Sequence, residues 1–158
     1  MTRQWRRSCG DNTNHAIMSE GIKTREFRID DYDAALALWK RVGGIEIAEG
    51  DSREEVAQFL SHNPGLSRVA EDGATMAGVA LCGHDGRRGH IYHLAVAPNY
   101  QRAGLGKRLV DECLNSLRCA DITRAIILVA DDNECGRSFW RRRGWEDVPG
   151  ALAMGIDL

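Results

Sequence analysis

Long hydrophobic runs and an excess of charge of one sign are missing from this sequence of 158 residues, and we do not expect a secretory signal. No apolar stretch approaches the roughly 18 residues that a membrane-spanning helix needs, and residues 1–14 lack the apolar segment of a secretory signal. The 21 basic and 23 acidic side chains leave a formal net charge of −2, which argues against a strongly basic nucleic-acid binder. The sequence therefore predicts neither a membrane nor a nucleic acid as partner.

A disulfide framework and a structural zinc site are also not expected. The five cysteines are odd in number and widely spaced, and no two of them form a C-x-x-C pair. Such usage is typical of reduced thiols in a protein of the cytoplasm. We therefore expect a cytoplasmic protein without a metal site.

The remaining pattern predicts a flexible tail over residues 1–20 and a single domain over residues 21–158. Within it, we expect a strand at 22–29, helices beginning near Asp31 and at the capping box of Ser52 and Glu55, and an antiparallel three-stranded meander over 66–97. Its two type I′ turns are predicted at Asp72-Gly73 and Asp85-Gly86. A helix from 104, a strand at 125–130, a helix at 133–143 and closing strands at 145–157 complete a mixed α/β (α+β) domain.

A short glycine-rich loop precedes the long predicted helix. It reads Gln101-Arg102-Ala103-Gly104-Leu105-Gly106-Lys107-Arg108, and it follows a predicted strand. The first amides of a helix have no partner within the helix, and the helix dipole favours an anion there. The loop thus predicts a phosphate or pyrophosphate site, with a glycine turn that binds nothing as the alternative. It lacks the Walker spacing, and Leu109 stands where a dinucleotide fingerprint needs a third glycine.

Two blocks of sequence resemble the GNAT superfamily of acyl-CoA-dependent N-acyltransferases. Residues 94–106 are similar to its signature segment, in which Gln101, Gly104 and Gly106 fit the pattern [QR]-x-x-G-x-[GA]. The second block, an asparagine followed by a helix with an aromatic ending, is matched by Asn133, Phe139, Trp140, Gly144 and Trp145. The resemblance implies a central, mostly antiparallel sheet of six to seven strands flanked by about four helices.

The resemblance further implies acetyl-CoA as the cofactor. Its pyrophosphate would take amide hydrogen bonds from the loop, and its pantetheine arm would lie along the strand before the loop, where the Leu94 amide would face the thioester oxygen. The residues implied for the cofactor are Leu94, Ala95, Val96, Gln101, Arg102, Ala103, Gly104, Leu105, Gly106, Lys107, Asn133 and Trp140.

Transfer to an amine requires a base, because a primary amine is mostly protonated at neutral pH. His90 is the first candidate, acting directly or through water. Simple strand alternation puts His90 and Tyr92 on one face and His93 on the other, although a bulge would change this count. Trp140 replaces the tyrosine that the resemblance leads us to expect as proton donor to the leaving thiolate. Tyr92 is the candidate substitute, and departure without a dedicated acid is the alternative.

These observations predict an N-acetyltransferase. The acetyl group of acetyl-CoA would move to a primary amine of a small molecule or peptide by direct attack in a ternary complex, and a homodimer is possible. An acidic stretch around residues 46–55 would favour a cationic acceptor if it lines the cleft, and is otherwise an exposed acidic surface. The alternative function is a catalytically weak acyl-CoA-binding regulatory or interaction module.

Overall fold

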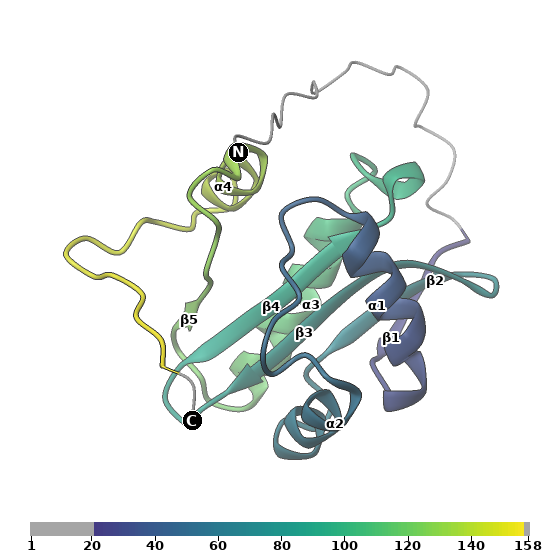
Figure 1. Cartoon of the computed structure of the whole chain (residues 1–158), viewed down its shortest axis with the longest axis horizontal. Coiled ribbons are helices and arrows are strands. Elements are labelled where there is room, and N and C mark those ends of the chain that lie inside the picture. The colour runs from purple at the N-terminus through teal and green to yellow at the C-terminus, as the bar shows by residue number, and fades with distance from the viewer. Residues whose placement is uncertain (1–20, 157–158) are drawn as a thin grey trace. The chain divides into compact units, whose positions relative to one another are not determined.

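The computed structural model describes residues 21–156, and the chain divides after Ile127 into two compact units. The first unit is built on a five-stranded sheet in the order β1-β2-β3-β4-β5 (Figure 1). The first four strands are antiparallel to their neighbours, whereas β5 runs parallel to β4. The strands are β1 (Lys23–Glu26), β2 (Arg68–Asp72), β3 (Thr75–His84), β4 (Gly89–Val96) and β5 (Ala125–Ile126).

Three helices cover this sheet. Two of them, α1 (Tyr32–Arg41) and α2 (Arg53–His62), pack on one face, and α3 (Leu105–Cys119) packs on the other (Figure 1). Short 3-10 turns, η1 (Ile29–Asp31) and η2 (Pro98–Tyr100), lead into α1 and into the glycine loop. The capping box at Ser52 and Glu55 is confirmed, since the Ser52 hydroxyl accepts from the Glu55 amide and the Glu55 carboxylate accepts from the Ser52 amide.

The core lies on both faces of the sheet. On the α1 side, Trp39 and Phe27 are completely enclosed together with inward residues of β2, β3 and β4. On the other side, α3 buries a stripe that includes Leu109, Cys113 and Leu117. Their spacing of four residues keeps them on one face of the helix. This burial holds β4 between two layers, and β4 is followed by η2 and then by the glycine loop.

The second unit, residues 128–156, holds the helix α4 (Glu134–Arg141) and no strand. The mixed α/β class is confirmed, but the predicted strand count is wrong for the described residues, which form five strands instead of six or seven. The predicted strand at 125–130 is reduced to Ala125–Ile126, and residues 145–156 are irregular. Alternating apolar residues there, such as Leu152 at 92% exposure, have no strand beside them within this unit. An alternating sequence pattern identifies an apolar face, but it does not show which strand would pair with that segment.

Both hairpin turns also differ from the prediction. Gly73 and Ala74 connect β2 to β3, and only Gly73 has a positive φ, whereas a type I′ turn needs two positive φ values. The β3–β4 connection is a four-residue loop in which the Asp85 carboxylate accepts from the amides of Arg87 and Arg88. A side chain that bonds to the backbone can replace the tighter two-residue turn.

Two predictions concern the limits of the chain and its surroundings. The flexible tail at residues 1–20 lies outside the described residues. No helix between residues 21 and 156 has the length and apolar character to cross a membrane.

Gly89, at the start of β4, tests the packing of α3. A Cβ added there would meet three side-chain atoms of Leu117, the nearest at 2.4 Å, and Leu117 is itself buried. We expect Gly89→Ala to lower the free energy of unfolding by about 1–3 kcal/mol, measured by urea denaturation. Gly43→Ala is the matched control, because nothing lies within 4 Å of its Cβ. Equal stability of the two variants would contradict this packing.

Candidate functional site

The glycine loop makes its turn at Gly104, directly before α3. Gly104 has φ +81° and caps the helix, and a Cβ added there would meet no atom within 4 Å. Arg102 also takes a left-handed conformation, with φ +63°, which is uncommon for a residue with a side chain. The loop therefore contains two residues in left-handed backbone conformations, and open space lies in front of Gly104.

The amides at the start of α3 are available to a ligand. The first bond of the helix runs from the Arg108 amide to the Gly104 carbonyl, at 3.0 Å. The amides of Leu105, Gly106 and Lys107 consequently have no acceptor within the helix. Unpaired amides and the positive end of the helix dipole favour a phosphate group at this place.

The charged side chains of the loop are largely engaged elsewhere. Lys107 pairs with Asp111 at 2.9 Å. Arg108 donates to Thr24 and to the Ile22 carbonyl, and so ties α3 to the first strand. The Arg108 guanidinium thus has partners within the first unit. Backbone amides, together with Arg102, are the chief donors that the loop presents.

β4 presents a free edge to the same region. It pairs with β5 only through Gly89 with Ala125 and His90 with Ile126. Beyond these pairs, residues 91–96 have no strand on that edge within the first unit, as far as it is described. The Gln101 side chain donates to the Val96 carbonyl at 2.9 Å and thereby fastens the loop to the end of β4. An extended chain of amides and carbonyls can add to such an edge.

A β-bulge interrupts the other edge of β4. Val79 of β3 pairs with Ala95, but Leu81 pairs with Tyr92, so one residue of β3 stands opposite two residues of β4. The extra pair is His93 and Leu94, and His93 has φ +48°. The bulge changes which side chains share a face from this point onward.

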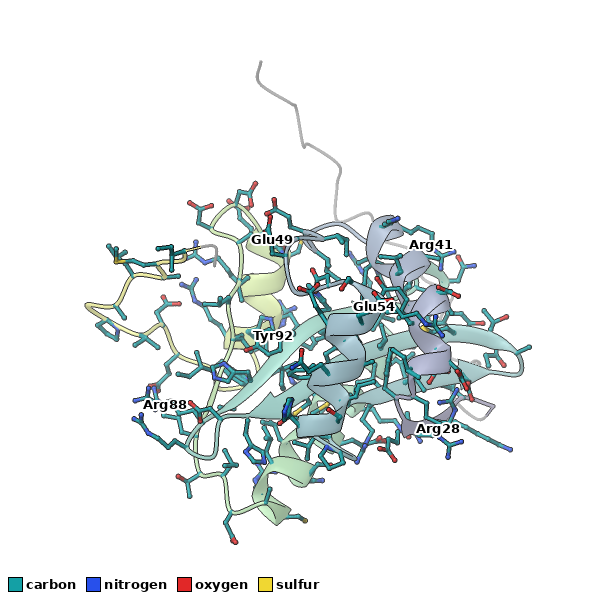
Figure 2. All side chains as sticks on the ribbon, turned by 60° about the horizontal axis from the view of Figure 1, so that its bottom comes forward. Arg28, Arg41, Glu49, Glu54, Arg88 and Tyr92 are labelled. Atoms are coloured by element: carbon teal, nitrogen blue, oxygen red, sulfur yellow. The ribbon has the colours of Figure 1, made fainter. Side chains whose placement is uncertain are left out.

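His90 and Tyr92 lie on the face that α1 and α2 cover. Their rings stack with centroids 5.6 Å apart, and Tyr92 also meets Phe59 of α2 edge to face at 5.9 Å. Figure 2 shows Tyr92 projecting from β4 on the side of α2. Their predicted common face is confirmed. The alternation that placed His93 on the opposite face is wrong, because the bulge turns it to the side of Trp39.

The structure places a side-chain pair here that sequence reasoning missed. His93 Nε2 lies 2.6 Å from Asp51 Oδ1, although the two residues are 42 positions apart. Both side chains are mostly enclosed, at 18% and 13% exposure. Asp51 belongs to the acidic stretch and comes from the loop between α1 and α2. The possible bulge was a signal for His93, but nothing in the spacing of the sequence connects it to Asp51.

Asn133 and Trp140 belong to the second unit. The Asn133 side chain accepts from the Gly136 amide at 2.8 Å and so caps the start of α4. The Trp140 ring packs edge to face against Phe139 and Trp145, at 5.1 and 5.0 Å. Within this unit, the block thus forms a capped helix with an aromatic cluster.

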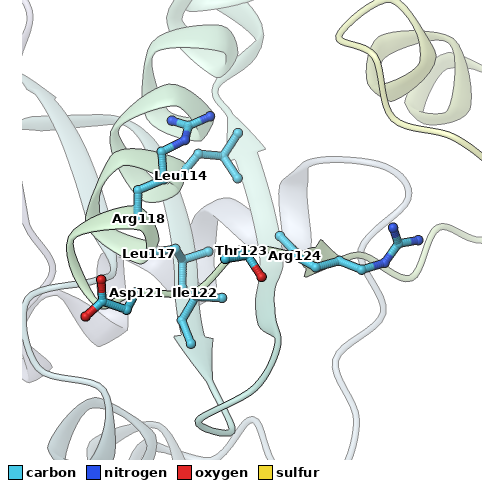
Figure 3. A pocket seen from close by; sticks show the side chains of 8 residues that line it. Leu114, Leu117, Arg118, Asp121, Ile122, Thr123 and Arg124 are labelled. Atoms are coloured by element: carbon cyan, nitrogen blue, oxygen red, sulfur yellow. The ribbon is translucent and has the colours of Figure 1, made fainter.

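A hollow of about 580 Å³ lies away from all these residues, at the C-terminal end of α3 (Figure 3). Residues of α3 and of the connection to β5, including Arg118, Asp121 and Arg124, line it. Its lining begins at Leu114, about 14 Å along the axis of α3 from Leu105 at the glycine loop. None of the predicted site residues lines this hollow. Across residues 21–156, no group of histidine, cysteine or acidic side chains is arranged to hold a metal ion.

Comparisons with known sequences match this chain to acetyltransferases. Residues 24–145 match the model of the acetyltransferase (GNAT) family. An acetyltransferase of Sodalis glossinidius is 28% identical over 137 residues, covering 87% of this chain and 96% of its own length. An acetyltransferase of Pectobacterium atrosepticum is 28% identical over 127 residues, covering 80% and 89%.

Solved structures show the same fold. An acetyltransferase from Streptococcus agalactiae superimposes with a TM-score of 0.71 at 13% identity, covering 89% of this chain and 93% of its own. A predicted acetyltransferase with acetyl-CoA from Clostridium acetobutylicum has a TM-score of 0.67 at 16% identity, covering 85% and 96%.

The three tyrosines of the chain provide a test of the site's environment. Partial burial and then Asp85 raise the pKa of Tyr92. Burial and then Asp51 raise the pKa of Tyr32, and the hydrogen bond to Asp72 raises the pKa of Tyr100. In a titration followed by ultraviolet absorbance, we expect all three phenols to ionise above pH 10 in the folded protein and near pH 10 in denaturant.

The same shifts predict how stability depends on pH. Each phenol binds its proton more tightly in the folded state, so the free energy of unfolding falls as the pH rises from about 10 through the folded-state pKa values. Tyr92→Phe and Tyr100→Phe assign the individual transitions. A folded-state phenol that titrates below pH 10 would contradict the environment described.

Proposed function

We propose that this chain, which belongs to the acetyltransferase (GNAT) family, transfers the acetyl group of acetyl-CoA to a primary amine of a small molecule or peptide by direct attack in a ternary complex. Membership of the family makes it an acetyl-CoA-dependent acyltransferase. The acceptor class and the route of transfer are the proposal. One observation carries it most: the open Gly104 turn and the unpaired amides of α3 adjoin the free edge of β4.

The residues of this chain fit acetyl-CoA. The amides over residues 102–107 suit its diphosphate, and the open space at Gly104 admits a group that a side chain would exclude. Leu94, Ala95 and Val96 on the free edge of β4 suit the amides of its pantetheine arm. Asn133 and Trp140 belong to the second unit, and their contact with the cofactor stays a prediction from the resemblance. When bound, the cofactor supplies an acetyl thioester, the group that an amine can attack.

The Leu94 amide is the proposed donor to the thioester oxygen. Leu94 belongs to the bulge, where the regular ladder with β3 is interrupted and an amide can be directed away from its neighbouring strand. A fixed amide that faces an oxygen gaining negative charge lowers the barrier to acyl transfer.

The acceptor side is proposed to be the face of β4 with His90 and Tyr92. The pKa of Tyr92 is raised, so its phenol keeps its proton at neutral pH. A thiol has a pKa of about 8–9, below that of a phenol. Full proton transfer from Tyr92 to a leaving thiolate would therefore be uphill, and Tyr92 is better suited to donate a hydrogen bond. We therefore expect that tryptophan instead of tyrosine at position 140 lowers the reaction rate only slightly.

Acetyl-CoA binding gives the first test. We expect acetyl-CoA or CoA at about 100 times its dissociation constant to raise the melting temperature by about 5–10 °C. Gly104→Val removes this shift, because the side chain fills the space before the loop and strains the turn. Gly86→Val is the matched control: Gly86 has φ +87° and equally open surroundings, but it lies at the opposite end of β4. It keeps the shift.

Thiol release separates the enzyme from a binding module. The alternative of a catalytically weak acyl-CoA-binding module rests only on Trp140, which stands where the resemblance leads us to expect tyrosine. A panel of polyamines, amino acids, aminoglycosides and peptide N-termini is incubated with acetyl-CoA, and free CoA is measured. We expect at least one amine to accelerate CoA release at least about 100-fold over the buffer rate. Binding of acetyl-CoA without release by any amine would favour the module.

A further inference from the structure

The contact between His93 and Asp51 determines which ring nitrogen carries the hydrogen. A carboxylate can only accept a hydrogen bond, so Nε2, which lies 2.6 Å from Asp51 Oδ1, is the donor. In the neutral ring, Nδ1 then carries the lone pair. Among residues 21–156, Nδ1 has no hydrogen-bond partner. The side chain therefore holds a basic nitrogen that the fold does not use.

Asp51 is itself held by three further contacts. Its second oxygen, Oδ2, accepts from the Ala48 amide at 3.0 Å, and its own amide donates to the Ala48 carbonyl at 3.3 Å. Its carbonyl accepts from the Tyr32 hydroxyl at 2.6 Å. A carboxylate fixed in this way orients the imidazole that it contacts.

The His93 backbone is held as firmly as its side chain. The indole of Trp39, which is completely buried, donates to the His93 carbonyl at 3.2 Å. The two rings also pack with centroids 4.9 Å apart. These contacts maintain a left-handed φ that an L-residue rarely adopts. The strain is confined to the bulge, which also carries Leu94, the proposed donor to the thioester oxygen.

From this geometry we propose that His93 is the general base of the acceptor site and that Asp51 is its positioning residue, a role that rests on the proposed function. Nδ1 takes a proton from the protonated amine, whose nitrogen keeps the electron pair of the broken N–H bond. The products of this step are the neutral amine and an imidazolium beside the Asp51 carboxylate. The imidazolium later returns its proton to solvent. An oriented base of this type typically contributes 10²–10⁴-fold to a rate.

His93 fits this role better than His90. The His90 ring stacks on Tyr92, and no carboxylate among residues 21–156 is hydrogen-bonded to it. His93 has a carboxylate partner on one nitrogen and a free lone pair on the other. The nearest titratable group on the helical side is Tyr32, on which the charges of Asp33, Arg53 and Glu54 also act. On β4, the neighbouring titratable groups are His90 and Tyr92.

Two amines distinguish a base from a structural contact. Spermidine is protonated at neutral pH and must lose a proton, whereas hydroxylamine is largely uncharged and needs no base before attack. We expect His93→Asn to lower kcat/KM for spermidine about 100-fold or more and for hydroxylamine less than about 5-fold. Asp51→Asn lowers the spermidine value about 10-fold or more. Asparagine suits position 93 because it tolerates a left-handed φ.

The variants need two controls. His62→Gln, at the exposed end of α2, leaves both rates unchanged. The rise in melting temperature with acetyl-CoA persists in His93→Asn and Asp51→Asn, which shows that both variants fold and bind the cofactor. An equal loss for both amines, or a selective loss of spermidine transfer in His90→Asn but not in His93→Asn, would overturn the assignment.

A second measurement needs no activity. Long-range ¹H–¹⁵N NMR on the protein without cofactor reports the tautomer of each histidine. We expect hydrogen on Nε2 of His93 and a lone pair on Nδ1, with the preference weakened in Asp51→Asn. Hydrogen on Nδ1 would contradict the proposal. If the wild type binds acetyl-CoA but acetylates neither amine nor any member of the panel, the proposed function fails, and the tautomer alone decides whether the pair exists.

Discussion

The bulge in β4 is the constraint on which the rest of the site depends. Ala80 of β3 stands opposite both His93 and Leu94, and His93 accepts a left-handed backbone as a result. Such a conformation costs about 1–2 kcal/mol, which the Trp39 indole offsets by its bond to the His93 carbonyl and its ring contact. The buried Trp39 of α1 thus stabilises the bulged conformation of β4.

The bulge also joins two functions on one strand. Toward its end, β4 offers an unpaired edge and is followed by the Gly104 turn and the unpaired amides of α3, where we propose that the cofactor binds. On the face toward α1 and α2, the same strand carries Tyr92 and His93, where we propose that the acceptor amine loses its proton. The proposed sites for the acetyl donor and for the acceptor amine both lie along β4. The burial of this strand between α1 and α3 therefore fixes their relative positions.

The sequence predicted most of this framework, since its signals are local. The apolar stripe of α3, the Ser52 cap and the turn at Gly104 each depend on residues within a few positions of one another. The pair of Asp51 and His93 was missed, because it depends on a register shift and on a loop 42 positions away. The closing strands predicted at 145–157 are absent from the described residues 145–156 for a related reason. An apolar alternation shows that a segment can pair, but its partner strand depends on the tertiary structure.

An NMR titration of the ¹⁵N-labelled protein with acetyl-CoA tests the central claim most directly. If the cofactor occupies the loop and the free strand edge, the amide signals of residues 102–107 and of 91–96 shift together and saturate at one dissociation constant. The amide signals of the residues that line the hollow at the end of α3, between Leu114 and Ala125, do not shift. Shifts confined to that hollow, or no shift at the Gly104 turn, would contradict the account.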